Sequence, residues 1–138
     1  MSIPIPAEVR ELLEKPNFVH LALVRRDGTP HSIPVWVGLE DERILIGTAM
    51  GSLKSRATKR NPAVALSVVD RDNPYREANL TGRVVEHRPD DDFTVMDAIA
   101  RKYTGEPFPV RGPDRVALVI EAESAQHRVL PFPAPGRI

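Results

Sequence analysis

Short runs of hydrophobic positions, separated by polar turns, fill the first third of the chain. Residues 18–24 are dense in apolar side chains, and residues 31–39 and 43–49 follow as two further predicted strands. An Arg-Asp-Gly-Thr turn at 26–29 and an acidic turn at 40–42 connect them. Because these connections are too short for crossover helices, we expect an antiparallel meander rather than the parallel units of a Rossmann fold.

The strand pattern continues through the second half of the chain. Residues 63–69 and 77–86 are predicted strands, separated by the polar loop 70–74. Residues 115–121 predict another strand, and residues 126–131 are expected to be extended. Six or so strands with inserted helices predict a mainly β fold with flanking helices, a six-stranded antiparallel barrel. Such a small barrel has little free interior, so we expect a cofactor-sized ligand to lie in a groove between subunits.

Three segments have the features of helices. Pro6 suits a first helical turn and Pro16 ends this helix, which we expect to pack as a lid on the sheet. Residues 51–60 predict a second short helix that stops at an Asn-Pro pair. The third, residues 90–103, begins with three aspartates and is followed by Gly105. The helix macrodipole explains these aspartates better than a bound cation does.

The composition of the chain limits which chemical groups could give the protein an activity. A length of 138 residues is that of one domain, so we interpret residues 1–138 as a single domain. The 19 basic and 19 acidic residues cancel, which removes a general attraction to nucleic acid or to an anionic membrane. The sequence contains neither a membrane-spanning apolar run nor the pattern of a signal peptide, so we expect a cytoplasmic protein. With no cysteine for thiolate chemistry, a borrowed cofactor becomes the favoured source of reactivity.

One segment concentrates positive charge. Between residues 47 and 60 the chain carries Lys54, Arg56, Lys59 and Arg60 and no acid. Small residues that lead into a helix leave backbone N–H groups free, and hydroxyls beside cations complete the usual means of binding phosphate. We therefore predict an anion site in this segment. The alternative is a solvated basic helix face.

No residue is an obvious catalytic group. The four histidines lack metal-ligand spacing, so we predict no metal site, and the chain has no Gly-x-Ser-x-Gly elbow that would support a hydrolase. Trp36, the only tryptophan, is expected to fill the core or a subunit interface. Pro34 within a predicted strand implies an edge or a bulge, where a planar ligand can approach the backbone.

The order of several short motifs resembles a known superfamily. The motifs are Asp-Gly-Thr-Pro-His-Ser-Ile-Pro-Val-Trp (27–36), Ile-Leu-Ile-Gly-Thr (44–48), Ser-Leu-Lys-Ser (52–55), Lys-Arg-Asn-Pro (59–62), Asn-Pro-Tyr-Arg (73–76) and Leu-Thr-Gly-Arg-Val-Val-Glu (80–86). Together they resemble the pyridoxamine-phosphate-oxidase-like split barrels, or FMN-binding split barrels, over almost the whole chain. Within that superfamily the sequence is most similar to the subgroup that uses the deazaflavin coenzyme F420 in place of FMN.

This resemblance implies a homodimer with cofactor sites at the subunit interface. The second strand would lie along the ring system of the cofactor, and the end of the third strand would run beside its ribityl chain. The residues implied for the ring are Ile33, Pro34 and Val35, and those for the ribityl chain are Gly47, Thr48 and Ala49.

The resemblance also implies how the anionic end of the cofactor is bound. Ser52, Lys54 and Ser55 would contact the phosphate, with Arg56, Lys59 or Arg60 nearer the anionic tail. Tyr75 of the partner subunit would cover the ring. Close relatives can carry arginine at the position of Ser52, so one strong phosphate contact is missing from this chain.

The activity implied by the resemblance is transfer of a hydride from reduced coenzyme F420 to an unsaturated or conjugated small-molecule acceptor. Because a deazaflavin itself carries the hydride, the protein has to orient two ligands and needs few acid or base groups. Two alternatives stay open. One is an FMN-dependent oxidase or reductase of the same fold, and the other is a non-catalytic protein that binds a cofactor or a haem-like ligand.

Overall fold

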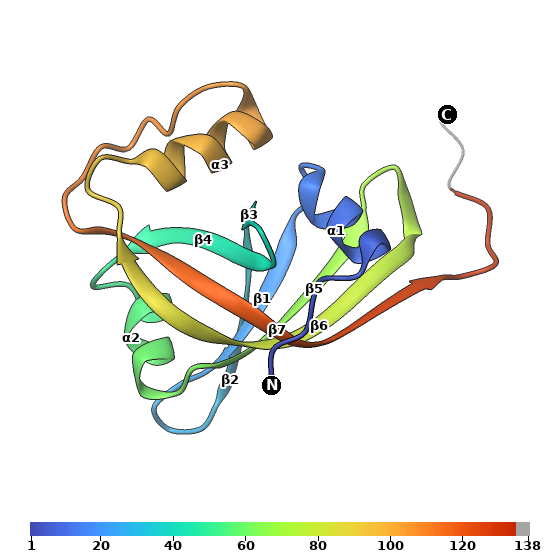
Figure 1. Cartoon of the computed structure of the whole chain (residues 1–138), viewed down its shortest axis with the longest axis horizontal. Coiled ribbons are helices and arrows are strands. Elements are labelled where there is room, and N and C mark those ends of the chain that lie inside the picture. The colour runs from blue at the N-terminus through green and yellow to red at the C-terminus, as the bar shows by residue number, and fades with distance from the viewer. Residues whose placement is uncertain (135–138) are drawn as a thin grey trace.

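The computed structural model describes residues 1–134 as a strongly curved sheet with three helices around it (Figure 1). None of the helices in this range is long and apolar enough to cross a membrane. In chain order the elements are α1 (Ala7–Glu14), β1 (Val19–Val24), β2 (Pro30–Val35), β3 (Gly38–Glu40), β4 (Arg43–Ala49), α2 (Leu53–Arg60), β5 (Ala63–Asp70), β6 (Asn73–Pro89), α3 (Thr94–Thr104) and β7 (Arg115–Val129).

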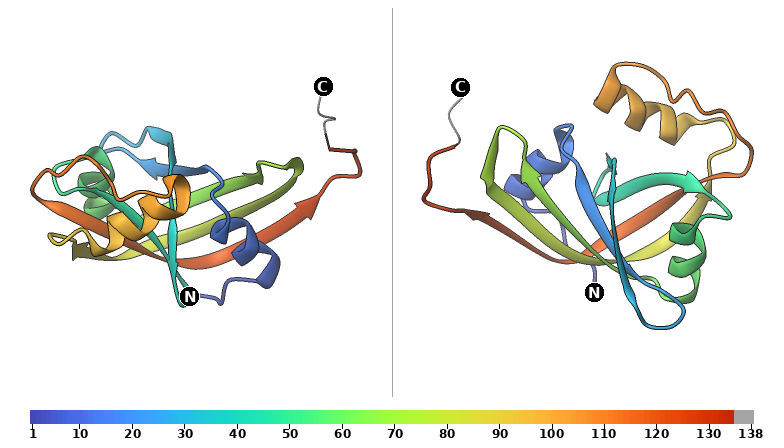
Figure 2. Two further views of the ribbon diagram at one scale, coloured as in Figure 1. Left: turned by 90° about the horizontal axis from the view of Figure 1, so that it is seen from above. Right: turned by 180° about the vertical axis from the view of Figure 1, so that it is seen from behind.

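The strands form one antiparallel sheet in the order β2-β1-β5-β6-β7-β4-β3. Its two edge strands, β2 and β3, are consecutive in the chain and are separated by Trp36 and Val37 alone. The sheet therefore curls until its edges approach each other, as the two views in Figure 2 show. Within the described residues no pairing joins β2 to β3, so the barrel stays split. The predicted fold class is confirmed, with seven strands in residues 1–134 instead of six.

The predicted three-stranded meander is confirmed in the antiparallel pairing of its consecutive strands, but the three strands do not lie side by side in the sheet. β1 and β2 do form a hairpin, but β4 pairs with β3 and β7, at the other edge of the sheet. The predicted strand 31–39 divides at the Trp36–Val37 crossing into β2 and β3. Val35 and Val37 are both buried, so the alternation of a strand continues across the crossing although the hydrogen-bonding partners change. Pro34 lies in an edge strand, as predicted.

The two longest strands, β6 and β7, pair along most of their lengths and cross the whole sheet (Figure 1). The predicted loop 70–74 shrinks to a turn because β5 ends at Asp70 and β6 begins at Asn73. β7 runs without interruption through the predicted strand 115–121 and into the predicted extended segment 126–131, as far as Val129. Register shifts at Thr81/Gly82 and Val84/Glu86 interrupt the β6–β7 ladder. Such bulges bend a strand, which suits a pair that follows a curled sheet.

Helix α3 begins at Thr94, four residues after its predicted start, because the aspartates precede its N-cap residue, Phe93, and are not part of the helix. The two carboxylate oxygens of Asp90 accept hydrogen bonds from the N–H groups of Val95 and Met96, each at 2.9 Å. Asp92 accepts one from the N–H of Thr94 at 3.1 Å. These contacts confirm that the acids serve the helix N-terminus.

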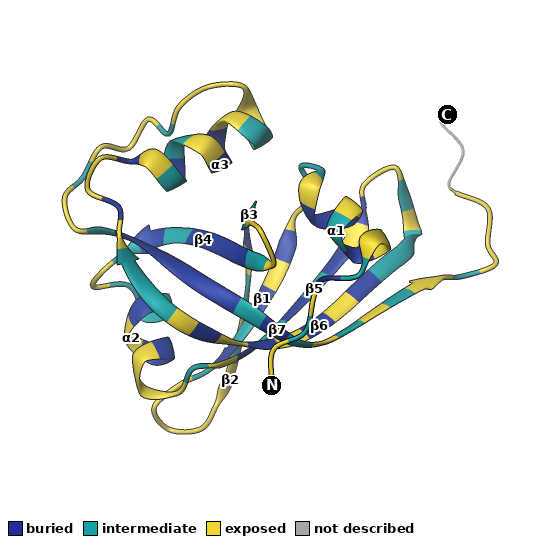
Figure 3. Ribbon diagram, in the orientation of Figure 1, coloured by how far each residue is buried: buried dark blue, intermediate teal, exposed yellow. Residues whose placement is uncertain are grey.

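Alternate residues of the central strands face two hydrophobic clusters (Figure 3). The larger cluster lies inside the curl and is closed by α1, whose Leu12 and Leu13 are fully buried, which confirms the predicted lid. The smaller cluster lies between the sheet and α3 and includes Leu45 and Val119. This double coverage explains the continuous apolar runs 44–46 in β4 and 116–120 in β7.

Gly82 marks a point where two backbones meet at a bulge. An added Cβ would overlap the carbonyl oxygen of Glu121 and would lie 3.2 Å from Cγ2 of Ile120. Because a backbone atom cannot move aside cheaply, we expect Gly82→Ala to lower the free energy of unfolding by about 2 to 3 kcal/mol. Chemical denaturation measures this change. Gly112→Ala is the matched control, since no atom lies within 4 Å of its added Cβ. Equal stabilities of the two variants would contradict the pairing of β6 with β7 at this point.

Candidate functional site

A groove of about 430 Å³ is formed by the residue before β1 and by residues of β2, the β2–β3 crossing, β4, α2, α3, the loop after α3 and the start of β7. A second cavity of about 430 Å³, lined by residues of α1, β3 and α3, contains none of the predicted site residues. The first groove brings four predicted residues together and is therefore the candidate site. Its lining residues are Phe18, Pro34, Val35, Trp36, Gly47, Lys54, Met96, Phe108 and Arg115.

Aromatic side chains form one wall of this groove. The Trp36 ring stacks on Tyr103 with centroids 5.1 Å apart and 10° between planes, and Phe108 meets Trp36 edge-on at 6.5 Å. The Tyr103 hydroxyl donates to the carbonyl oxygen of Asn17 at 2.6 Å and accepts from the N–H of Val37 at 3.2 Å. Tyr103 thereby ties the β2–β3 crossing to α3, which holds Trp36 in place.

Gly47 lets α3 lie close to β4. A Cβ at this position would overlap the Sδ atom of Met96, so a larger residue would push that side chain into the groove or away from the sheet. A close approach of this kind is a common reason for glycine inside a strand. Gly47 therefore helps to set the shape of the groove.

Two cations, Lys54 and Arg115, line the same groove. Burial and the nearby positive charge of Arg115 lower the pKa of Lys54. The guanidinium carbon of Arg115 lies 5.2 Å from the ring centroid of Phe108 and 5.9 Å from that of Phe93. Sequence reasoning missed Arg115, because only the pairing of β4 with β7, which sets Arg115 opposite Ala49, brings it to the groove.

Residues 5–128 match the family model of pyridoxamine 5'-phosphate oxidase. The chain belongs to this family. Its fold matches the solved structure of an F420 reductase with a TM-score of 0.80 and 35% identity, covering 88% of this chain and 98% of that one. It also matches a conserved hypothetical protein of Mycobacterium tuberculosis with a TM-score of 0.74 and 22% identity, covering 99% of this chain and 94% of that one. A third match is General Stress Protein 26 of Bacillus anthracis, with a TM-score of 0.68 and 17% identity, covering 88% of this chain and 91% of that one. These two likenesses show the fold alone. No curated protein matches the chain.

The family assignment confirms the resemblance inferred from the motifs. The pyridoxamine 5'-phosphate oxidase family binds flavin-like cofactors. Membership of this family, together with the related F420 reductase, supports an oxidoreductase function.

In this member of the family, the predicted phosphate contacts differ in their exposure. The Ser52 Oγ atom caps α2 by accepting from the N–H of Ser55 at 3.2 Å, and it accepts from the Thr48 hydroxyl at 2.9 Å. The Ser52 hydroxyl proton stays available for a further acceptor. Ser55 is fully buried, so its side chain does not reach the groove, whereas Lys54 does.

The other predicted cations lie on the exposed side of α2. Arg56 donates from Nε to the carbonyl oxygen of Gly51 at 3.0 Å and is exposed. Lys59 and Arg60 are exposed in the last turn of the helix, where positive charge suits the helix dipole. None of the three lines the groove, so a contact with the cofactor would require a tail that extends beyond it.

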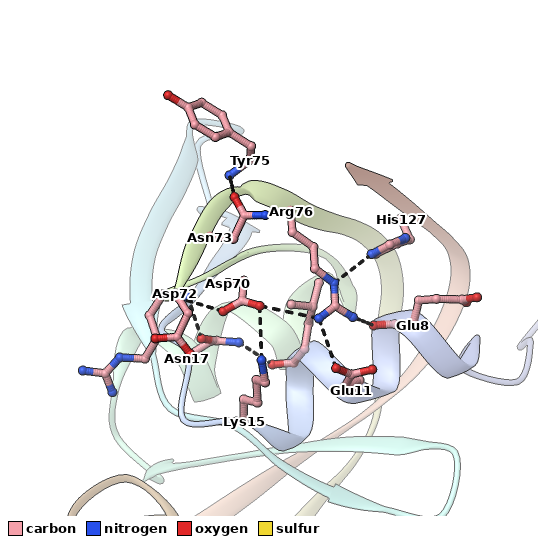
Figure 4. A network of polar contacts seen from close by, with 12 residues as sticks. Glu8, Glu11, Lys15, Asn17, Asp70, Asp72, Asn73, Tyr75, Arg76 and His127 are labelled. Carbon is pink, nitrogen blue, oxygen red and sulfur yellow. Dashed lines mark hydrogen bonds and ion pairs between the residues drawn. The ribbon is translucent and has the colours of Figure 1, made fainter. Parts of the chain in front are cut away.

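Ile33 and Tyr75 are not brought to the groove of their own chain. Ile33 packs against the main core, on the opposite face of β2 from Pro34. The Tyr75 ring packs against Phe132 with centroids 5.3 Å apart. In Figure 4 it points away from the polar network around Asp70. The role of Tyr75 in a partner subunit stays a prediction.

Proposed function

We propose that this protein is an oxidoreductase that binds coenzyme F420 in the groove and passes a hydride from the reduced deazaflavin to an unsaturated or conjugated small molecule. One observation carries the proposal: a half-buried cation, Lys54, stands at the side of an aromatic and apolar groove. Flat apolar walls with a cation suit a planar ring that carries a phosphorylated side chain. The 35% identity to an F420 reductase favours the deazaflavin over FMN.

Reduced deazaflavin, when bound, would supply the hydride, and the protein would hold the cofactor and the acceptor in the orientation needed for the transfer. Pro34 and Val35 offer an apolar edge for the ring, and Trp36, held by the stacked ring of Tyr103, forms a stiff wall beside it. Gly47 lets Met96 lie close to β4 and so sets the shape of the groove where the side chain of the cofactor would run. These groups orient the cofactor without gaining or losing a proton, and no acid or histidine of residues 1–134 lines the groove. Oxidation of the reduced deazaflavin releases a proton as well as the hydride, and a proton from this source or from solvent would complete the reduction of the acceptor.

A homodimer is part of the proposal. Phe18 at the rim of the groove is 57% exposed, which is unusual for an aromatic side chain and leaves an apolar surface for a second subunit to cover. Tyr75 of the partner subunit would then face the ring. Sedimentation at micromolar concentration is expected to show a dimer. A monomer that binds the cofactor as tightly as the dimer does would show that the partner subunit contributes nothing to the site.

Titration of the purified protein with F420 and with FMN tests the proposed cofactor. We expect tighter binding of F420, followed by oxidation of the reduced cofactor when conjugated acceptors are added. Tighter FMN binding with turnover on FMN alone would overturn the proposal. Bound F420 that stays reduced with a broad panel of acceptors would instead indicate a cofactor-binding protein without turnover.

Recognition of the tail separates F420 from FMN, the second candidate. FMN ends in one phosphate, whereas the deazaflavin extends into carboxylates that can reach the exposed end of α2. Reversing the charges of Lys59 and Arg60 together is therefore expected to weaken F420 more than FMN. Equal losses for the two cofactors would favour FMN.

A further inference from the structure

Arg115 stands out among the partly buried arginines because it has no counter-ion in residues 1–134. Its Nε atom is buried without a hydrogen-bond partner there, and no carboxylate forms an ion pair with its guanidinium group. Arg76 and Arg88, by contrast, each pair with two carboxylates. A buried donor left unpaired costs free energy, and such groups in folded proteins usually have a partner.

Two aromatic rings hold Arg115 without neutralising it. Phe108 and Phe93 lie within cation–π distance of its guanidinium carbon. Both come from outside β7, Phe108 from the loop after α3 and Phe93 from the turn before α3. The side chain is thus positioned by packing, and its N–H groups stay free to bind something else.

A second positive charge faces the same space. Lys54 lines the groove with Arg115, and no acidic residue among residues 1–134 lines it. Two like charges in a partly buried groove destabilise each other, and an anion placed between them relieves both. The like-charge effect is visible in Lys54, whose pKa is lowered by burial and by Arg115.

We infer that Arg115 and Lys54 form a two-cation site for one phosphoryl or carboxylate group, and that Arg115 helps to decide which ligands the groove accepts. The inference rests on the proposed function in that it concerns the same groove. The anionic group is either the phosphoryl group of the cofactor or an anionic oxygen of the acceptor. A guanidinium fork suits both, since each presents two oxygens in a plane.

Arg115→Met tests the site, because methionine keeps an apolar stem against the two phenylalanine rings and removes the charge. F420 is compared with the corresponding deazaflavin riboside that lacks phosphate, and FMN is compared with riboflavin. We expect phosphorylated forms to bind about 10- to 100-fold more weakly and phosphate-free forms to be unaffected. Arg115→Lys is expected to restore part of the loss, since it keeps the charge without the fork. Arg26→Met, in an exposed turn, is the matched control.

The outcomes separate the two sources of the anion. A loss confined to phosphorylated cofactors assigns the site to the cofactor. Unchanged cofactor binding, with a raised KM for acceptors that carry a carboxylate but not for neutral ones, assigns it to the acceptor. Equal losses for phosphorylated and phosphate-free ligands, or no loss with any ligand, would overturn the two-cation site. Because FMN and riboflavin give the same contrast, the test remains valid even if the protein does not use F420.

Discussion

Replacing Lys54 with glutamate is expected to weaken binding of the phosphorylated cofactor about 100-fold. The substitution removes a charge-assisted hydrogen bond, worth about 1.5 to 3 kcal/mol, and adds repulsion between a carboxylate and the phosphate. The new carboxylate would also lie near Arg115, whose charge already acts on Lys54, and would compete with the ligand for that guanidinium group. Fluorescence titration with F420 and FMN measures both losses.

Stability separates this effect from general damage to the fold. Because Lys54 is half-buried and faces another cation, reversing its charge removes a repulsion, and we expect no decrease in the free energy of unfolding. Lys54→Met should lose about 10-fold in affinity, since it removes the attraction without adding repulsion. Arg26→Glu changes the net charge equally in an exposed turn and should bind as the native protein does. Unchanged affinity of Lys54→Glu for both cofactors would contradict the phosphate site.

The sequence predicts the positions of the strands and helices better than it predicts which strands pair with each other in the sheet. Alternation of apolar residues reports which side of a strand is buried, and this signal located β1, β4 and β5 closely. Alternation cannot show that β3 and β4 lie at the opposite edge of the sheet from β2. A strand has the same pattern of apolar and polar residues whichever strands it pairs with. Gly38 directly follows the Trp36–Val37 crossing, but a single glycine within a strand pattern indicates a bulge or a close backbone approach as readily as a break.

Residues of the candidate site were predictable from the sequence only where they lie within motifs that resemble the family. Pro34, Val35, Gly47 and Lys54 lie in segments that resemble the family, and the fold does bring them to one groove. Phe108 and Arg115 come from the last third of the chain and reach the groove through the position of α3 and the pairing of β4 with β7. Long-range pairing of this kind leaves no local signal in the sequence.

Replacing Asp70 with asparagine is expected to lower the free energy of unfolding by about 2 kcal/mol, because Lys15 and Arg76 lose their charge-assisted hydrogen bonds to a buried carboxylate. The Asp70 side chain is 6% exposed, and Oδ2 accepts from Lys15 Nζ at 3.2 Å and from Arg76 Nη1 at 3.5 Å. Its Oδ1 accepts from the N–H of Asp72 at 2.9 Å. Figure 4 shows how this network joins the β5–β6 turn to α1. Chemical denaturation measures the loss, and exposed Asp72→Asn is the matched control.

The pH dependence distinguishes the charge of Asp70 from its packing. Burial alone would raise the pKa of Asp70, but the hydrogen bonds from Asp72 and Lys15, with the charges of Lys15 and Arg76, hold it below its ordinary value of 3.8. A carboxyl group with a lowered folded pKa contributes stability above its unfolded pKa and loses that contribution as the pH falls through the folded value. The native protein should therefore be more stable than Asp70→Asn at neutral pH, and the difference should shrink in acid as the carboxyl group takes up its proton. A difference that stays constant in acid would mean that Asp70 stabilises the turn through shape and hydrogen bonding, with no contribution from its charge.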